Sequence, residues 1–175
     1  MNADDLRALQ APLKTRYKEA PAAALITLTA EGNLDDQEIA CSVETGKALV
    51  KAGLHPATGG DGSFACSGDM LLQALAACAG VTLKAVATAL GISLKSGKVR
   101  CEGDLDFCGT LGVDKGAPVG FRFIRLAFDL DTDADEAAVA KLIQLTERYC
   151  VVFQTIKVSP AVSVAVNRPK AAGRP

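Results

Sequence analysis

The sequence contains no tryptophan, and aromatic residues make up only 5% of its 175 residues. Surfaces that stack on nucleic-acid bases are built from aromatic side chains, so little material for such a surface is present. A charge surplus is lacking as well, since nineteen basic residues face twenty acidic ones and the net charge is −1. No strong field attracts phosphate backbones, and we therefore expect no nucleic-acid partner.

Metal ligands in a clustered pattern are also missing. His55 is the only histidine, and no two of the six cysteines form a C-x-x-C motif. Zinc and non-haem iron centres are built from such grouped ligands. We therefore expect no metal site.

An export signal is not visible in the first residues, MNADDLRALQAPLKTRY, because acidic residues stand where a basic start and an apolar run would be needed. We expect a cytoplasmic protein whose cysteines are mostly free thiols. The stretch from Met70 to Ile92 is long and apolar, but Gln73, Lys84 and Thr88 interrupt it and no aromatic belt flanks it. We expect no membrane span.

The order of predicted elements favours an α+β fold, because strands and helices come in blocks without a regular βαβ alternation. We predict one domain over residues 1–175 with mainly antiparallel strands, a short helix at 4–13, a core from about 24 to 166 and a disordered tail at 168–175. Alternating β-branched residues and turn signals predict two hairpins and a final strand. The predicted strands cover 24–29, 37–44, 98–107, 121–131 and 158–166, and a further helix ends near Cys150.

A long helix is predicted from about 68 to 90, after a loop at 54–67 that is rich in Gly, Pro, Ser and Asp. The helix is apolar almost all the way round. In a soluble protein that pattern indicates a central helix enclosed on several sides.

The run GGDGSFACSGDMLLQALAACAGVTLKAVA resembles the helix signature of the OsmC/Ohr family, the osmotically inducible and organic hydroperoxide resistance proteins. In that signature a Gly- and Ser-rich loop leads into an Ala-rich helix with one cysteine, and Cys78 occupies that position. A later family element, a cysteine followed by small or apolar residues, matches TERYCVVFQTI at Cys150. The resemblance extends from about Thr27 to Val166.

The resemblance implies an intertwined α+β homodimer with active sites near the subunit interface. It also implies a peroxidase that needs no bound cofactor. Cys78 would attack an organic hydroperoxide, become a sulfenic acid and condense with Cys150 to a disulfide, which a dithiol such as a protein-bound dihydrolipoyl group would reduce. The apolar surroundings of Cys78 predict a preference for alkyl hydroperoxides over hydrogen peroxide.

A peroxidatic thiol must ionise near neutral pH, and Cys78 lies about nine residues into its helix, beyond the turn where the helix dipole acts. A cation is therefore expected beside it. In the family an arginine, held by an acidic residue of the helix, has this role. Asp69 is the candidate holder, and Arg16 and Arg148 are the candidate arginines.

Two other functions remain open. A noncatalytic, stress-related binding protein of the same fold would hold an apolar ligand, with incidental cysteines. A cysteine hydrolase or acyltransferase would need a base beside Cys78, and only His55 is available.

The other polar and thiol residues have plainer interpretations. Cys66 is expected to be a partly buried loop thiol, with a role as a second resolving thiol left open. His55 is expected to be a solvated loop side chain. Cys41, Cys101 and Cys108 are expected to lie in strands.

Overall fold

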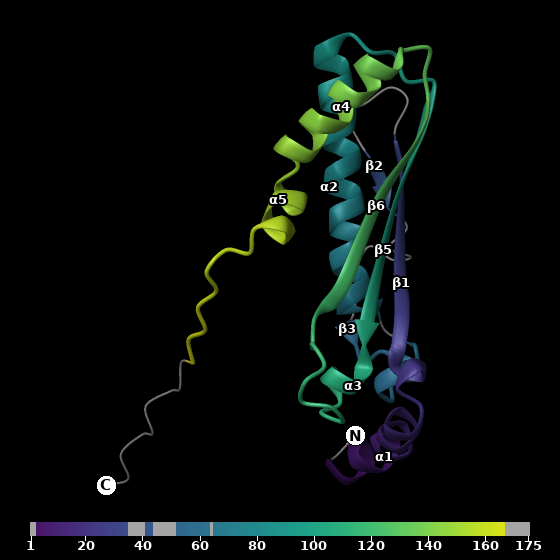
Figure 1. The fold of residues 1–175 in the computed structure, drawn as a ribbon, viewed down its shortest axis with the longest axis vertical. Coiled ribbons are helices and arrows are strands. Elements are labelled where there is room, and N and C mark those ends of the chain that lie inside the picture. The colour runs from purple at the N-terminus through teal and green to yellow at the C-terminus, as the bar shows by residue number, and fades with distance from the viewer. Residues whose placement is uncertain (1–2, 35–40, 44–51, 64, 167–175) are drawn as a thin grey trace, which may run out of the picture.

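A four-stranded antiparallel sheet and one long helix form the body of the elongated chain (Figure 1). The computed structural model describes residues 3–34, 41–43, 52–63 and 65–166. The strand order is β2-β1-β5-β6. The strands are β1 (Leu25–Leu34), β2 (Cys41–Val43), β5 (Ser96–Asp106) and β6 (Phe121–Asp131).

The predicted α+β class and the hairpin formed by β5 and β6 are confirmed. The first predicted hairpin is only partly right, because β1 continues through Gly32, where a turn was expected. The pairing of β1 with β5, from Leu25 opposite Asp106 to Asn33 opposite Lys98, holds this stretch extended. Residues 35–40 lie outside the described part of the chain.

The central helix, α2 (Ser67–Leu90), agrees with the prediction and lies along one face of the sheet (Figure 1). Its buried side carries Leu72, Leu75 and Leu83, and it also packs against α4. Among the described residues it is the one helix long and apolar enough to cross a membrane. Core helices pass the same test, and its packing on the sheet accounts for its apolar composition.

In the single chain, α2 is buried on one side and exposed on the other. Its sequence, in contrast, indicates burial on several sides. An apolar stripe of Met70, Leu71, Ala74 and Val81 is exposed along the side that faces away from the core. These positions recur every three or four residues and so share one helix face. This stripe, which also includes the half-buried Cys78, is called the open face of α2 below.

The N-terminal helix, α1 (Ala3–Glu19), is longer than the predicted 4–13 and runs through Pro12. Packing explains the extension, because Leu13 and Tyr17 join the core and the Tyr17 hydroxyl donates a hydrogen bond to the Ala57 carbonyl at 2.8 Å. Short elements follow it and lead to α2. They are η1 (Pro21–Ala24), β3 (Ala52–Gly53), η2 (Pro56–Thr58) and β4 (Ala65–Cys66), and β3 pairs with β4 in parallel.

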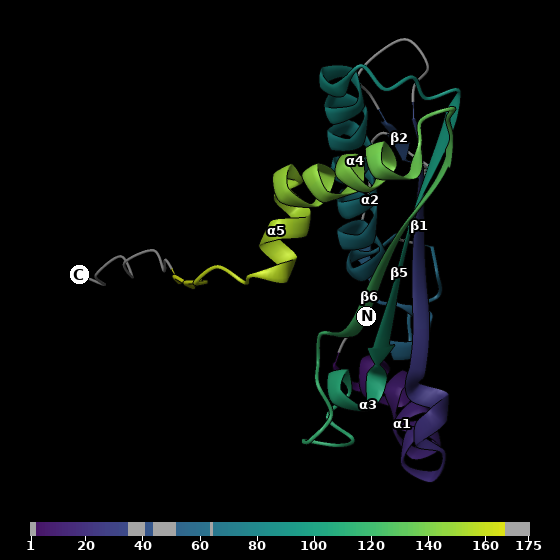
Figure 2. The ribbon, with the colours of Figure 1, turned by 45° about the horizontal axis from the view of Figure 1, so that its top comes forward.

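Three helices complete the fold: α3 (Phe107–Thr110), α4 (Glu136–Tyr149) and α5 (Val151–Lys157). Asp135 caps α4 by accepting a hydrogen bond from the Ala138 N–H at 2.7 Å, and α4 crosses α2 (Figure 2). The predicted final strand is wrong, because residues 158–166 have no regular structure and extend away from the sheet. A strand needs a neighbour for its backbone hydrogen bonds, and this segment has none within the described chain. The tail at 168–175 lies outside the described residues.

Candidate active site

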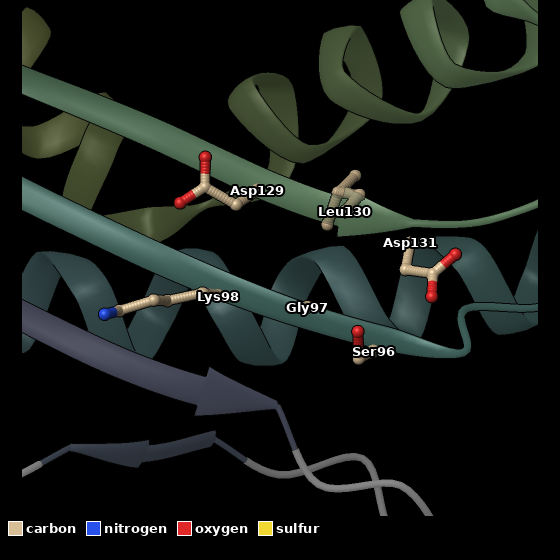
Figure 3. Close-up of a pocket in the computed structure, with 6 residues that line it drawn as sticks. All are labelled: Ser96, Gly97, Lys98, Asp129, Leu130 and Asp131. Carbon is tan, nitrogen blue, oxygen red and sulfur yellow. The ribbon is translucent and has the colours of Figure 1, made fainter.

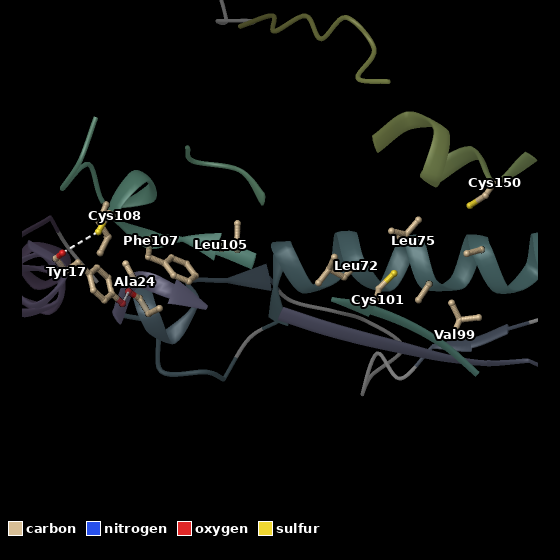
Figure 4. Close-up of a cluster of buried hydrophobic side chains, with 14 residues drawn as sticks. Tyr17, Ala24, Leu72, Leu75, Val99, Cys101, Leu105, Phe107, Cys108 and Cys150 are labelled. Carbon is tan, nitrogen blue, oxygen red and sulfur yellow. Dashed lines mark hydrogen bonds between the residues drawn. The ribbon is translucent and has the colours of Figure 1, made fainter. Parts of the chain in front are cut away.

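The two cysteines of the predicted pair meet between α2 and the junction of α4 with α5. Cys78 is half-buried in the middle of α2, and Cys150 is fully buried at the single residue that separates α4 from α5. That residue is extended, with φ −70° and ψ 108°, so the chain bends there and the Cys150 sulfur points toward α2 (Figure 4). The two thiols lie close enough that each acts on the pKa of the other.

The pKa values of the two thiols move in opposite directions. Burial raises the pKa of Cys78, but hydrogen bonds from the Val152 backbone, Cys150, the Val151 backbone and Thr82 outweigh it, and the net pKa lies below the ordinary value. Burial, together with a smaller contribution from the nearby Cys78, raises the pKa of Cys150 to about 11. Cys78 is therefore the thiol that ionises first, and Cys150 remains a protonated donor beside it.

The start of α5 is the feature that sequence reasoning missed. Its first backbone groups, at Val151 and Val152, act on Cys78 in the role for which a cation was expected. The sequence predicts a helix that ends near Cys150 and a strand at 158–166, with no helix between them. The helical spacing of Val152, Phe153 and Ile156, which pack together on the core, is the signal that favours a helix instead.

Neither candidate arginine is among the groups that shift the pKa of Cys78 most. Arg16 is exposed on α1, at the end of the molecule opposite to α4 (Figure 1). Arg148 is exposed in the last turn of α4, with its guanidinium carbon 5.6 Å from the centre of the Tyr149 ring. The predicted cation is thus not supplied by either residue within one chain.

Asp69 and Cys66 lie together at the start of α2. Asp69 is half-buried in the first turn, where burial raises its pKa and the nearby His55, its electrostatic partner, lowers it. Cys66 is the residue before the helix, twelve positions from Cys78. Twelve residues of helix span about 18 Å, and a disulfide needs Cα atoms within about 7 Å. Cys66 therefore cannot resolve Cys78 within one chain.

Two further thiols, Cys101 and Cys108, are buried. Cys101 lies in β5, where burial and then the nearby Cys150 raise its pKa to about 12. Cys108 lies in α3, which corrects the expected strand position, and its Sγ is 3.5 Å from the Tyr17 carbonyl that it donates to (Figure 4). The side chain of Cys41 is outside the described residues. No group of three metal-ligating side chains occurs in the part of the chain that the structure describes.

One hollow of about 420 Å³ lies at the open end of the β5–β6 hairpin, where β5 begins and β6 ends (Figure 3). Its lining residues contain no cysteine or histidine, and Asp129 at its edge pairs with Arg100 at 3.4 Å. It offers neither a thiol nor an imidazole, and it is set aside as a site for the thiol chemistry. The lining residues are Ser96, Gly97, Lys98, Asp129, Leu130 and Asp131.

The fold is that of an α+β protein in which a long helix packs on an antiparallel sheet. One cysteine lies on this helix, and a second cysteine lies beside it at the junction of α4 with α5. The family model described as OsmC-like protein matches residues 60–165, which is more than half of the chain. The chain belongs to the OsmC-like family, and the predicted family is confirmed.

A solved structure supports the same fold. The chain is similar to an OsmC-like hydroperoxide resistance protein from Jannaschia sp. CCS1, with a TM-score of 0.60 and 15% sequence identity over 84% of this chain and 96% of that one. No curated protein matches the chain. The match to the family model begins after α1 and His55, which are therefore features that the family model does not cover.

Proposed function

We propose that the protein is a thiol-dependent peroxidase that reduces organic hydroperoxides. The observation that carries this proposal is the close pair of Cys78 and Cys150, in which the pKa of the first is lowered and that of the second is raised. An ionised thiol next to a protonated one is the arrangement that a two-cysteine peroxidase needs. The similar solved structure is named a hydroperoxide resistance protein, which supports the same activity here.

The proposed reaction begins at the Cys78 sulfur. The thiolate attacks the distal oxygen of ROOH, the O–O bond breaks, and the alkoxide leaves as ROH after taking a proton. Cys78 is now a sulfenic acid. The Cys150 sulfur attacks it, a disulfide forms, and the hydroxyl leaves as water. A dithiol such as a protein-bound dihydrolipoyl group then returns both thiols to the reduced state.

The surroundings of Cys78 favour apolar hydroperoxides. Exposed Leu71, Ala74 and Val81 flank it on the open face of α2. Each methylene group that leaves water there contributes about 0.8 kcal/mol. We expect a higher kcat/KM for cumene or linoleic hydroperoxide than for hydrogen peroxide, and the opposite preference would count against the proposal.

A homodimer is proposed as the working state of the protein. The open face of α2 is apolar, and the extended segment 158–166 exposes Val162, Val164 and Val166 to 85%, 88% and 75%. Alternating valines of this kind are typical of a strand that lacks a partner. A second copy would cover both surfaces and provide the cation that one chain does not bring to Cys78. Light scattering should give twice the chain mass, and Val162→Asp with Val164→Asp should give monomers; a wild-type monomer contradicts this proposal.

The peroxidase proposal is tested by counting thiols after one equivalent of cumene hydroperoxide. Wild-type protein should lose two thiols, and Cys78→Ser should lose none. Cys150→Ser should complete one turnover, with a sulfenic acid at Cys78 that dimedone traps. Cys108→Ser removes a buried thiol elsewhere and should behave as wild type. Unchanged repeated turnover by Cys150→Ser would exclude it as the resolving residue.

A noncatalytic binding protein of the same fold is the second candidate. It is favoured by the positions of Arg16 and Arg148, because neither arginine is among the groups that lower the pKa of Cys78. In that case the hydroperoxide would leave all thiols intact. A cytoplasmic location is proposed for either function, because free thiols persist in a reducing compartment.

A further inference from the structure

A second thiol lies in a pocket at the N-terminal end of α2, about 18 Å of helix away from Cys78. The pocket has a volume of about 420 Å³, within the range of small-molecule sites. The described residues that line it include no carboxylate, lysine or arginine, and the polar ones include His55 and Cys66. A neutral, mostly apolar molecule is therefore the ligand that fits. The apolar walls are Leu54, Leu71, Leu105, Phe107, Val119 and Phe121.

One wall of the pocket is fixed by the N-terminal helix. The Tyr17 hydroxyl donates to the Ala57 carbonyl at 2.8 Å, and the Gln10 amide donates to the Thr58 carbonyl at 3.3 Å. The loop that carries His55 also closes tightly, since a Cβ at Gly60 would lie 1.8 Å from the Leu54 carbonyl oxygen. The pocket wall is thus formed before any ligand arrives, which lowers the ordering cost of binding.

The opposite wall depends on two further close contacts. A Cβ at Gly109 would lie 2.4 Å from the Pro118 carbonyl oxygen, so the loop that carries Val119 packs directly on α3. A Cβ at Gly103 would lie 2.4 Å from the Phe121 ring, which occupies that space instead. The positions of Val119 and Phe121 in this wall therefore depend on Gly109 and Gly103, where a larger side chain would not fit.

His55 is oriented as a hydrogen-bond donor. Its ring is stacked on Phe107, with centroids 4.9 Å apart and an interplanar angle of 17°, which corrects the expected solvated side chain. Its Nδ1 accepts the Ala57 N–H at 3.0 Å, so the proton of the neutral ring is on Nε2. His55 therefore offers an N–H rather than a free basic nitrogen, which disfavours its use as a general base for acyl transfer.

Cys66 provides the nucleophile of the pocket. It is half-buried, lies just before the first turn of α2 and makes no capping hydrogen bond with its side chain. Among the described residues that line the pocket there is no second thiol, and Cys78 is too distant to form a disulfide with Cys66. A peroxidase cycle has no resolving partner here, whereas an addition reaction requires only one thiol.

We infer that this pocket binds a neutral apolar carbonyl compound with a conjugated double bond, and that Cys66 adds to its β-carbon while His55 donates to the carbonyl oxygen. The Cys66 S–H bond breaks and an S–C bond forms. The π electrons of the double bond move toward the carbonyl, and the α-carbon takes up the thiol proton. Nothing is oxidised or reduced overall, and no group leaves.

The test uses the full chain as Cys78→Ser, so that adducts at Cys78 do not interfere, and trans-2-nonenal as the probe. Peptide mapping should place the adduct at Cys66, and its rate should saturate with nonenal concentration. Each methylene removed from the chain of the probe should lower the second-order rate constant up to about fourfold. Nonanal, which lacks the double bond, should give no stable adduct.

Matched variants separate the pocket from simple thiol reactivity. Cys66→Ser in the same background should abolish the adduct, and Cys66→Ser alone should keep full hydroperoxide turnover. His55→Leu should slow addition at least tenfold, and His55→Gln, which restores a donor, should recover part of the loss; circular dichroism checks that both fold. A Cys66 rate that does not saturate and does not depend on chain length overturns the inference, whatever the outcome at Cys78.

Discussion

The middle and the N-terminal end of α2 carry thiols in contrasting environments. Cys78 lies on the open face, beside the first backbone groups of α5 and the Cys150 thiol. Cys66 lies at the edge of a pocket whose apolar walls are held by α1, α3 and close glycine contacts. The contacts around Cys78 change the pKa of its thiol, whereas the residues around Cys66 form a cavity that a small molecule can enter.

This contrast shows that one helix supports two kinds of site through its neighbours. The contacts that act on Cys78 come from residues 82 and 150–152, within the span matched by the family model. The contacts that fix the His55 loop come from Tyr17 and Gln10, before that span. The pocket therefore combines both parts of the chain, because Cys66 and Phe107 lie within that span and His55 lies before it.

A cavity in the core that supports both regions of α2 should have the largest effect on the free energy of unfolding. Leu75 is 1% exposed and packs between the two regions. Leu75→Ala should lower the free energy of unfolding by about 2–5 kcal/mol, because it leaves a cavity in the core. Urea unfolding followed by circular dichroism measures this loss.

Leu90→Ala is the matched control, because Leu90 is 42% exposed at the end of the same helix and lies outside both the open face and the pocket. It should change the free energy of unfolding by no more than about 0.5 kcal/mol. Equal losses for the two variants would mean that α2 is not packed on the sheet as described.

Cys78 and Cys150 should react with iodoacetamide at very different rates. The pKa of Cys150 is about 11, so at pH 8 only about one molecule in a thousand carries its thiolate. Cys78, whose pKa is lowered, should be alkylated at least a hundredfold faster. Mass spectrometry of timed samples measures both rates, and preferential labelling of Cys150 would reverse the proposed roles.

The same raised pKa makes the stability depend on alkaline pH. The folded chain holds the Cys150 proton more tightly than the unfolded chain, so this contribution is present below about pH 9 and is lost as the pH rises through about 11. Cys101, with a pKa of about 12, acts in the same direction. Cys150→Ala should flatten the decline in the unfolding midpoint over this range, and an unchanged decline would contradict the burial of the proton.

Much of the body of the fold was predictable because periodicity reports local burial. The alternation over 121–131 and the apolar run at 68–90 gave elements within a residue or two of those observed. The failures have tertiary causes. Tyr17 extends α1 through a contact forty residues away, and the last valines lack the strand neighbour that their alternation indicates.

The site was less predictable than the fold. The resemblance drew attention to Cys78 and Cys150, but the hydrogen bonds that act on Cys78 come from a helix start that begins only after the bend at Cys150. His55 depends on Ala57 for its tautomer and on Phe107 for its stacking, and neither relation has a signal in sequence spacing.

Loosening the His55 loop should affect the pocket and spare the thiol pair. Tyr17→Phe leaves the buried Ala57 carbonyl without its 2.8 Å hydrogen bond. An unpaired buried group of this kind costs about 1–3 kcal/mol. We expect faster hydrogen exchange in residues 54–60 and slower addition of nonenal at Cys66, with the alkylation rate of Cys78 unchanged. An equal change at both thiols would show that the two regions are not independent.

The smallest expected effect comes from one donor of the Cys78 site. Thr82 lies one helical turn after Cys78, and its side chain hydrogen bonds to that thiol and lowers its pKa. Thr82→Val keeps the shape of the side chain and removes the donor. Because an intramolecular hydrogen bond contributes about 0.5–1.5 kcal/mol net, alkylation of Cys78 at pH 7 should slow by about three- to tenfold. The rate should recover at high pH, where Cys78 ionises without help, and the Cys66 rate should not move. A uniform decrease at every pH would instead indicate a steric effect and would remove Thr82 from the activation of Cys78.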